Sequence, residues 1–226
     1  MKGIIVLDQL ELSSEGVFAN QEKIALRQGD IDGACGPYSI LMGLIYHGVV
    51  TRAEVTSPDR VDGRTRLGKF LDGLCIFDTM VRKGTKIDEL EWLVGHFKSS
   101  PQAKVDLRTL ESESTRELAY EISECIDTDN PVVVGIDWQG GGAHWALVVG
   151  YEYFENQDDT QIITKLYLLD PGFEGPTTTY WNAVIQVADN TGSIINSGRF
   201  PSNHWSSNAN KPTLCKIFTG LALEQN

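Results

Sequence analysis

Apolar residues recur at intervals of three and four in three stretches of the first half of the chain, which is typical of amphipathic helices. Pro37 in the first turn and Gly48 after the last turn mark the ends of the first stretch, so its helix begins at Cys35. Ser114 or Thr115 is the expected N-cap of the third. The predicted helices and their apolar faces are 36–47 (Ile40, Leu41, Leu44, Ile45), 87–97 (Leu90, Leu93, Val94, Phe97) and 113–126 (Leu118, Ile122, Ile126).

The second half of the chain changes to runs of β-branched and aromatic residues separated by Gly, Asn, Asp and Pro, which is typical of antiparallel strands. The strands predicted there are 131–137, 144–154, 165–170 and 177–187, and two more are predicted earlier at 3–7 and 103–110. Residues 51–74 are charged and rich in glycine, which predicts an exposed connection with a short helix. Residues 196–212 predict a polar loop of a length typical of binding or disorder.

This order of elements predicts a single α+β domain over residues 1–226, with a helical part at about 1–127 and a sheet part at about 131–226. In that arrangement the helical layer carries the helix of Cys35 and packs against an antiparallel sheet. A cleft between the two layers is the expected place for a functional site.

The net charge of the chain excludes one class of binding partner. The chain has 31 acidic residues against 19 Lys and Arg, a formal net charge of −12, and no basic stretch, which argues against binding to nucleic acid. The apolar run before Asp8 is too short for a secretory signal, and no segment approaches the roughly 20 apolar residues of a membrane span. We therefore expect no membrane partner, and a location in the cytoplasm or delivery without a Sec signal.

The four cysteines lie far apart and form no C-x-x-C pair, so the spacing predicts neither a disulfide framework nor a zinc site. No other metal or cofactor is indicated. Cys75, Cys125 and Cys215 are interpreted as structural. Cys35 differs because a helix N-terminus lowers the pKa of a thiol, so it is either a packed residue or a nucleophile.

A nucleophilic thiol needs a base, and the four histidines differ in suitability. His47 lies twelve residues along the same helix, roughly 18 Å from Cys35 at 1.5 Å per residue, which excludes it. His96 closes a helix, where a surface histidine is expected on dipole grounds alone. His204 lies in the predicted polar loop, where nothing local fixes its orientation. His144 begins a strand, which holds its backbone and leaves its side chain at the strand end.

Asp170 ends the following strand before Pro171, and alone it reads as a turn residue. If the two strands form a hairpin, the turn falls in 155–161, and the midpoint of 144 and 170 is 157, inside that stretch. His144 and Asp170 are then nearly opposite, with Cβ atoms about 4.5 to 5.5 Å apart. The pairing predicts a carboxylate that orients the imidazole.

The stretches "QGDIDGACGPYS", "GGGAHWALVVGYEY" and "LYLLDPG" resemble the Cys, His and Asp blocks of papain-like cysteine peptidases. The likeness is nearest to the compact bacterial branch that includes bacteriocin-leader-processing peptidases. It implies a papain-like fold with Cys35 as nucleophile, His144 as base and then acid, and Asp170 as the orienting group. It also implies that Gln28 and the backbone N–H of Cys35 form an oxyanion hole.

The expected activity is that of a thiol hydrolase, a papain-like protease that cleaves peptide or isopeptide bonds of a peptide or protein substrate through an acyl-enzyme. Trp138 and Trp145 flank the glycine run before His144 and are candidate walls of the substrate groove, although each is also a candidate core residue. Two alternatives stay open. The same triad serves glutamine deamidases, transglutaminases and acyltransferases of bacterial effector type, and the fold also suits a peptide-binding module without turnover. The oligomeric state is not indicated.

Overall fold

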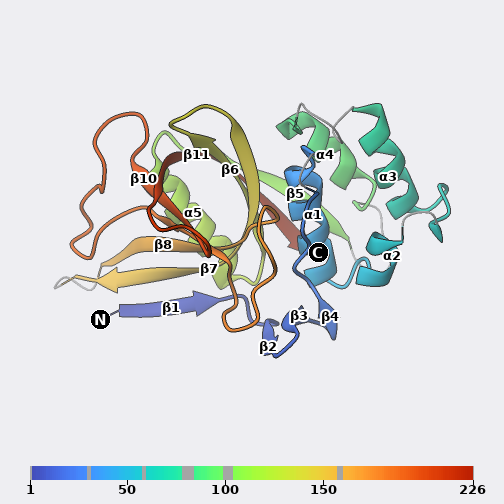
Figure 1. Cartoon of the computed structure of the whole chain (residues 1–226), viewed down its shortest axis with the longest axis horizontal. Helices are drawn as coiled ribbons and strands as arrows, with labels where there is room; N and C mark the ends of the chain where they lie inside the picture. The colour runs from blue at the N-terminus through green and yellow to red at the C-terminus, as the bar shows by residue number, and fades with distance from the viewer. Residues whose placement is uncertain are drawn as a thin grey trace.

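The helices within residues 35–95 gather on one side of the protein, and the long strands lie on the other side together with the helix of residues 115–127 (Figure 1). The computed structural model describes residues 2–29, 32–57, 60–77, 84–98, 104–156 and 160–225. The helices are α1 (Cys35–Tyr46), α2 (Arg52–Thr56), α3 (Arg66–Ile76), α4 (Ile87–Gly95) and α5 (Thr115–Asp127). The strands are β1 (Lys2–Val6), β2 (Glu11–Ser13), β3 (Gly16–Ala19), β4 (Glu22–Lys23), β5 (Val105–Leu110), β6 (Val132–Trp138), β7 (Ala143–Glu155), β8 (Gln161–Leu169), β9 (Ala183–Gln186), β10 (Ser202–Ser206) and β11 (Thr213–Gln225).

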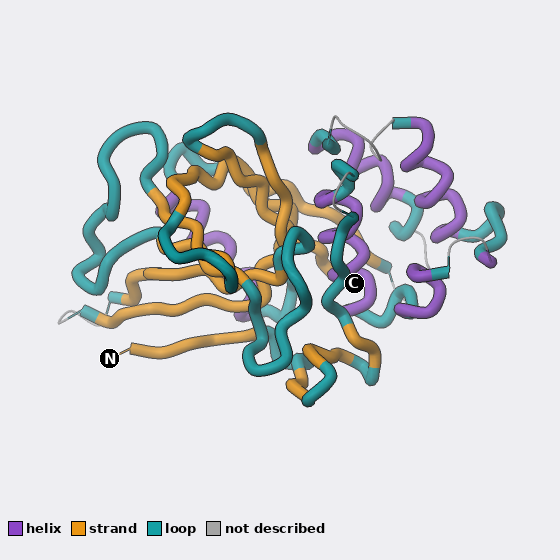
Figure 2. The backbone as a smooth tube through the Cα atoms, in the orientation of Figure 1, coloured by secondary structure: helices purple, strands orange, loops and turns teal. Residues whose placement is uncertain are grey.

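Six antiparallel strands close on themselves. The order β7–β6–β11–β10–β9–β8 returns to β7 because β7 also pairs with β8. The closed outline is visible in the tube view (Figure 2). β1 continues the sheet from β7 and β5 continues it from β11, while β2, β3 and β4 form a separate small sheet.

The two longest strands hold this sheet together by changing partners along their length. β7 pairs with β6 over its first half and with β1 over its second, and β8 lies along its other edge. β11 pairs with β6 on one edge and with β10 and then β5 on the other. Each of these 13-residue strands therefore ties the closed part of the sheet to an outer strand.

The helix that begins at Cys35 is the centre of the fold. Almost all of α1 is buried, because it packs against β6 and β7 on one side and α4 on the other. A helix that is apolar all round is expected in such a position. Gly43 allows the close approach, since a Cβ there would lie 2.4 Å from Leu223 Cδ1. The opposite end of the core is covered by α5, which contacts β11, β7 and β8.

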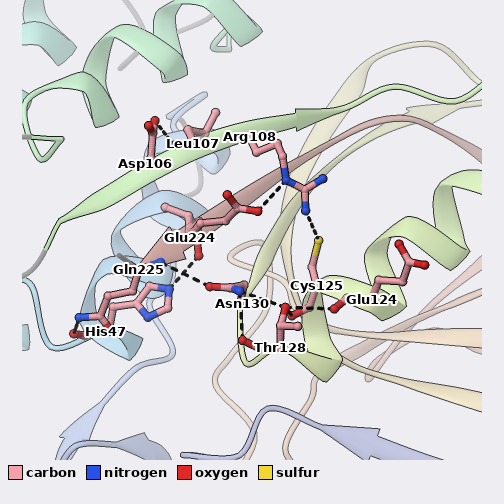
Figure 3. Close-up of polar contacts among 11 residues, drawn as sticks. His47, Asp106, Leu107, Arg108, Glu124, Cys125, Thr128, Asn130, Glu224 and Gln225 are labelled. Atoms are coloured by element: carbon pink, nitrogen blue, oxygen red, sulfur yellow. Dashed lines mark hydrogen bonds and ion pairs between the residues drawn. The ribbon is translucent and has the colours of Figure 1, made fainter.

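Polar contacts fix the last strand against the ends of α1 and α5 (Figure 3). His47 donates from Nε2 to the carbonyl oxygen of Leu223 at 2.8 Å, and Gln225 donates back to the carbonyl of His47 at 3.3 Å. Arg108 joins Glu224 at 2.6 Å and reaches the Cys125 sulfur at 3.3 Å. Burial lowers the pKa of His47, so this histidine is a neutral structural residue, in keeping with its exclusion as a base.

The α+β class and the antiparallel sheet agree with the sequence analysis, and so do α1, α4, α5, β1, β5, β6, β7 and β8. The division into a helical half and a sheet half was too simple, because β1 and β5 come from the first half and join the main sheet. The region 51–74 holds α2 and most of α3. Only 183–186 of the predicted strand 177–187 is a strand.

The predicted loop 196–212 was also wrong, because its middle forms β10 between β9 and β11. The final strand β11 was not predicted. β9 and β10 are short and lie beside polar residues, so it is their pairing within the sheet that defines them. Among the residues that the structure describes, no helix combines the length and the apolar character that a bilayer crossing requires.

The close contact at Gly43 gives a stability prediction. Gly43→Val should lower the free energy of unfolding by about 1–3 kcal/mol, because its side chain would overlap Leu223 in a packed core. Gly95→Ala is the matched control, since no atom lies within 4 Å of a Cβ at that helical glycine. Urea unfolding measures both, and equal stabilities of the two variants would contradict this account of the α1 packing.

Candidate active site

Residues from all six strands of the closed sheet meet at one end of it. Trp138 ends β6, His144 lies at the start of β7, Asp170 follows β8, and Thr213 starts β11. His204 lies in β10, and Asn182 directly precedes β9. Antiparallel strands alternate in direction, so the end of one strand lies beside the start of the next. The mouth of the closed sheet is therefore where polar side chains far apart in sequence come together.

His144 and Asp170 form the central pair of this mouth. The Nε2 atom of His144 lies 2.7 Å from Asp170 Oδ1, and the carboxylate is almost fully buried. Gly172 donates its backbone N–H to the same oxygen at 2.8 Å. Because Nε2 is bound to Asp170, Nδ1 is the ring nitrogen left for a thiol.

The predicted hairpin is present, but its strands pair two residues away from the predicted register. Glu155 pairs with Gln161, whose midpoint is 158 instead of 157, and Leu147 pairs with Leu169. Continuing this register sets Asp170 opposite Ala146, so His144 lies diagonally across from it. An offset of two residues keeps both side chains on the same face of the sheet, and their length spans the diagonal.

The pair is strongly polarised. Burial opposes the charge on His144, but the hydrogen bonds with Asp170 and Cys35 outweigh it and raise the pKa of His144 to about 10. Burial alone would raise the pKa of Asp170, yet His144 and His204 hold it well below its usual value. At neutral pH the site therefore contains an imidazolium beside a carboxylate.

Cys35 lies at the first residue of α1, mostly buried and close enough to His144 to contribute to the raised pKa of that imidazole. The N-cap of α1 is Ala34, which makes no side-chain cap bond, and the first turn holds no acidic residue. By contrast, Thr51, Thr65 and Ser114 cap α2, α3 and α5 with their side chains. The N-terminus of α1 thus keeps its positive end available to a negative charge on sulfur or on a substrate oxygen.

Gln28 lies beside the Asp170 turn. Its backbone N–H donates to the carbonyl oxygen of Pro171 at 2.9 Å, and Arg27 joins Glu174 at 2.6 Å. The side-chain oxygen of Gln28 is buried without a hydrogen-bond partner among the described residues. The segment is thus fixed next to the site, and the role of Gln28 as an oxyanion donor stays a prediction.

Asn182 holds the backbone of Asp170 and was not singled out from the sequence. Its Oδ1 accepts the N–H of Asp170 at 2.7 Å, and its Nδ2 donates to the carbonyl oxygens of Asp170 at 2.9 Å and Glu174 at 3.1 Å. The side chain is buried. Asn182 lies in the middle of the predicted strand 177–187, and no local pattern indicates it as a partner of Asp170.

His204 is the second residue near Asp170 whose position the sequence did not predict. It is buried on β10, with Nε2 3.4 Å from Asp170 Oδ2. The strand provides the orientation that a loop would lack. The signal was the alternation in "SNHWS", where Ser202 and His204 are buried and Trp205 is exposed.

The two tryptophans have different positions. Trp138 stacks on His144 at a centroid distance of 6.2 Å and lines a cavity of about 380 Å³ at the mouth. Trp145 does not line the substrate groove, as one of its two predicted positions had it. It is buried in the core, and its indole N–H donates to the carbonyl oxygen of Thr85 at 2.9 Å. Neighbouring residues on a strand point to opposite faces, so Trp145 turns away from the face that presents His144.

The cavity brings His144 and Asp170 next to a mixed polar and apolar surface. A mouth of a closed sheet is a common place for a ligand site. Its lining residues are Trp138, His144, Asp170, Gly172, Phe173, His204, Ser206, Ala209 and Thr213.

The cysteines are all free, and Cys125 and Cys215 are buried. Cys75 is exposed, which corrects its interpretation as a structural residue. Within the described ranges, no group of three or more His, Cys, Asp or Glu side chains is arranged to hold a metal ion.

No protein-family model matches the sequence, and no curated protein matches it significantly. Among solved structures, the chain is similar to UfSP from C. elegans, with a TM-score of 0.43 and 12% sequence identity. The superposition covers 99% of this chain and 34% of UfSP, so the chain spans about a third of the length of that protein. The chemistry proposed for the site is therefore based on its own side chains.

The hydrogen bonds that clamp the backbone of Asp170 to the side chain of Asn182 predict that loss of Asn182 lowers the stability of the protein. Asn182→Ala should lower the free energy of unfolding by about 1–3 kcal/mol, because it leaves buried backbone groups of Asp170 without partners. The control is Asn203→Ala, which removes one half-buried bond with Asn196 and should cost less. Urea unfolding compares the two variants, and a smaller loss for Asn182→Ala would contradict the clamp.

The contacts of His144 predict its titration. The Cε1–H resonance of His144 should titrate near pH 10 in an NMR experiment, because Asp170 and Cys35 stabilise its charged form. In Asp170→Asn the midpoint should fall, since the carboxylate charge is lost. His96, whose pKa is lowered by burial and by Lys69, is an internal reference. A wild-type midpoint for His144 near 6.5 would overturn this description of the site.

Proposed function

We propose that this chain is a papain-like thiol hydrolase that cleaves peptide or isopeptide bonds through an acyl-enzyme at Cys35. His144 is the acid and base of this reaction, and Gln28 contributes to the oxyanion hole. Asp170 orients His144 and stabilises its protonated form. The resemblance of the three sequence blocks to compact bacterial papain-like peptidases supports the same assignment. The substrate is a peptide or a protein.

One observation carries the proposal: the imidazole of His144 is hydrogen-bonded to a buried carboxylate on one side and interacts with the Cys35 thiol, at an uncapped helix N-terminus, on the other. A histidine that only filled the core would be neutral, as His47 is. An imidazolium beside a thiol favours the thiolate, which is the nucleophilic form of cysteine. This arrangement suits acyl transfer better than binding alone.

The reaction follows from these charges. The Cys35 sulfur attacks the substrate carbonyl carbon, and the negative charge that develops on the carbonyl oxygen is met by the backbone N–H of Cys35 and the Gln28 amide. His144 then gives its proton to the departing amine as the carbon–nitrogen bond breaks, which leaves a thioester on Cys35. Neutral His144 next takes a proton from water, whose oxygen attacks the thioester and releases the acid and the thiol.

The cavity beside His144 supports a role for the leaving side of the substrate. His144 has to reach the departing nitrogen, so the part of the substrate that follows this nitrogen lies near the residues that surround the imidazole. Trp138 and Phe173 provide apolar surface there, and Ser206 and Thr213 provide hydroxyl groups. We expect this cavity to take a side chain of the leaving peptide.

Thiol reactivity tests the proposal first. Iodoacetamide or E-64 at neutral pH should label Cys35 much faster than the exposed Cys75, although Cys35 is mostly buried. His144→Ala should slow the labelling of Cys35 and leave that of Cys75 unchanged, which makes Cys75 the internal control. Labelling of Cys35 no faster than that of Cys75 would refute the proposed chemistry.

Product analysis tests the reaction type. The protein is incubated with a diverse peptide and protein library, and mass spectrometry is used to find new termini that appear with the wild type and not with Cys35→Ala. A one-dalton increase at glutamine or a new amine adduct, in place of new termini, would replace hydrolysis by deamidation or transfer. An unchanged library with a reactive Cys35 would count against cleavage of ordinary peptide bonds.

A further inference from the structure

Two buried polar atoms at the mouth of the sheet face each other without a hydrogen bond. They are Oδ2 of Asp170 and Nε2 of His204, which lie 3.4 Å apart. Among the described residues neither atom has a hydrogen-bond partner, and both side chains are more than nine-tenths buried. Buried polar atoms in proteins are nearly always paired, so this couple requires an explanation.

The protein holds His204 firmly in this position. Its strand, β10, lies between β9 and β11, where His204 is opposite Ile185 and Thr213. Its ring packs edge-on against Trp138 at a centroid distance of 4.9 Å. Trp138 also stacks on His144, so one indole contacts both imidazoles. The neighbouring strands fix the backbone of His204 and Trp138 packs against its ring, so the fold directs this side chain at Asp170.

The two oxygens of Asp170 have different surroundings. Oδ1 accepts hydrogen bonds from His144 and from the backbone of Gly172. Oδ2 has only His204 at ion-pair distance among the described side chains. Without His204 this oxygen would be a buried acceptor with no donor in reach, and the carboxylate would gain freedom to rotate about its last bond.

We propose that His204 is a positioning residue for the active site, which donates a hydrogen bond to Asp170 Oδ2 and thereby keeps Oδ1 directed at His144. The inference rests on the proposed function, because it assigns His204 to the same acid and base pair. Hydrogen bonds of catalytic groups are often long in the absence of substrate and tighten when it binds, which fits a separation of 3.4 Å. The site then has one carboxylate between two imidazoles, of which only His144 contacts Cys35.

Alkylation of Cys35 tests this role. His204→Leu should slow the reaction of Cys35 with iodoacetamide by roughly tenfold to a hundredfold, the range found when a hydrogen-bond partner of a ligating histidine or carboxylate is removed from a metal site. His204→Gln should keep most of the rate, because its amide nitrogen can reach Oδ2 as Nε2 does. Trp205→Leu is the control on the same strand, since Trp205 points to the exposed face.

A double-mutant cycle separates positioning from a general structural effect. The effect of His204→Leu should disappear in an Asp170→Ala background, because His204 acts through that carboxylate. In the wild type, the Nε2 proton of His144 should also give a low-field NMR signal, which His204→Leu shifts and Trp205→Leu does not. Equal effects of His204→Leu with and without Asp170 would overturn the proposal.

The outcomes also separate this inference from the proposed function. If wild-type Cys35 reacts quickly and depends on His144, while His204→Leu reacts at the same rate, the role of His204 fails and the hydrolase proposal stands. If wild-type Cys35 is as slow as Cys75, the proposed function itself fails. Where His204→Leu does not fold, His204→Gln and His204→Asn decide, because the shorter Asn cannot reach Oδ2 and should lose the rate that Gln keeps.

Discussion

The pairing of β7 with β8 is the contact on which the site depends. It closes the sheet, and closure makes the ends of six strands meet at one mouth. An open sheet with the same strands would leave β8 and β7 on different edges and His144 far from Asp170. The same pairing removes two exposed strand edges, so the constraint that assembles the site also protects the sheet from edge-to-edge association.

The buried carboxylate of Asp170 is the group at that mouth whose burial costs the most free energy. Removing Asp170 from water is unfavourable unless charges and donors replace the lost hydration. The charge of His144, the N–H of Gly172 and the clamp of Asn182 on the backbone provide that replacement. The helix end beneath Cys35 provides a second favourable place for negative charge. The site thus separates two negative positions with one positive ring between them.

Local patterns in the sequence were sufficient for the helix of Cys35, for the hairpin and for the approach of His144 to Asp170. The predicted register of the hairpin was wrong by two residues. Side chains on a strand alternate between its faces, so His144 and Asp170 still lie on the same face. Trp145 was misplaced although the same alternation excludes it from the face of His144. His204 and Asn182 depend on strands that are too short and polar to be defined before they pair. Their roles come from contacts between distant segments, which no local pattern contains.

The position of β11 has a consequence for how the protein matures. Residues 213–225 fill the gap between β6 and β10, so the mouth cannot close until this segment has left the ribosome, long after Cys35 and its helix have been made. Long-range strand pairings of this kind are slow steps in folding. A growing chain therefore carries an unpaired cysteine with no assembled acid and base beside it. Under the proposed function, the surroundings that would activate Cys35 are complete only after residues 213–225 have been synthesised.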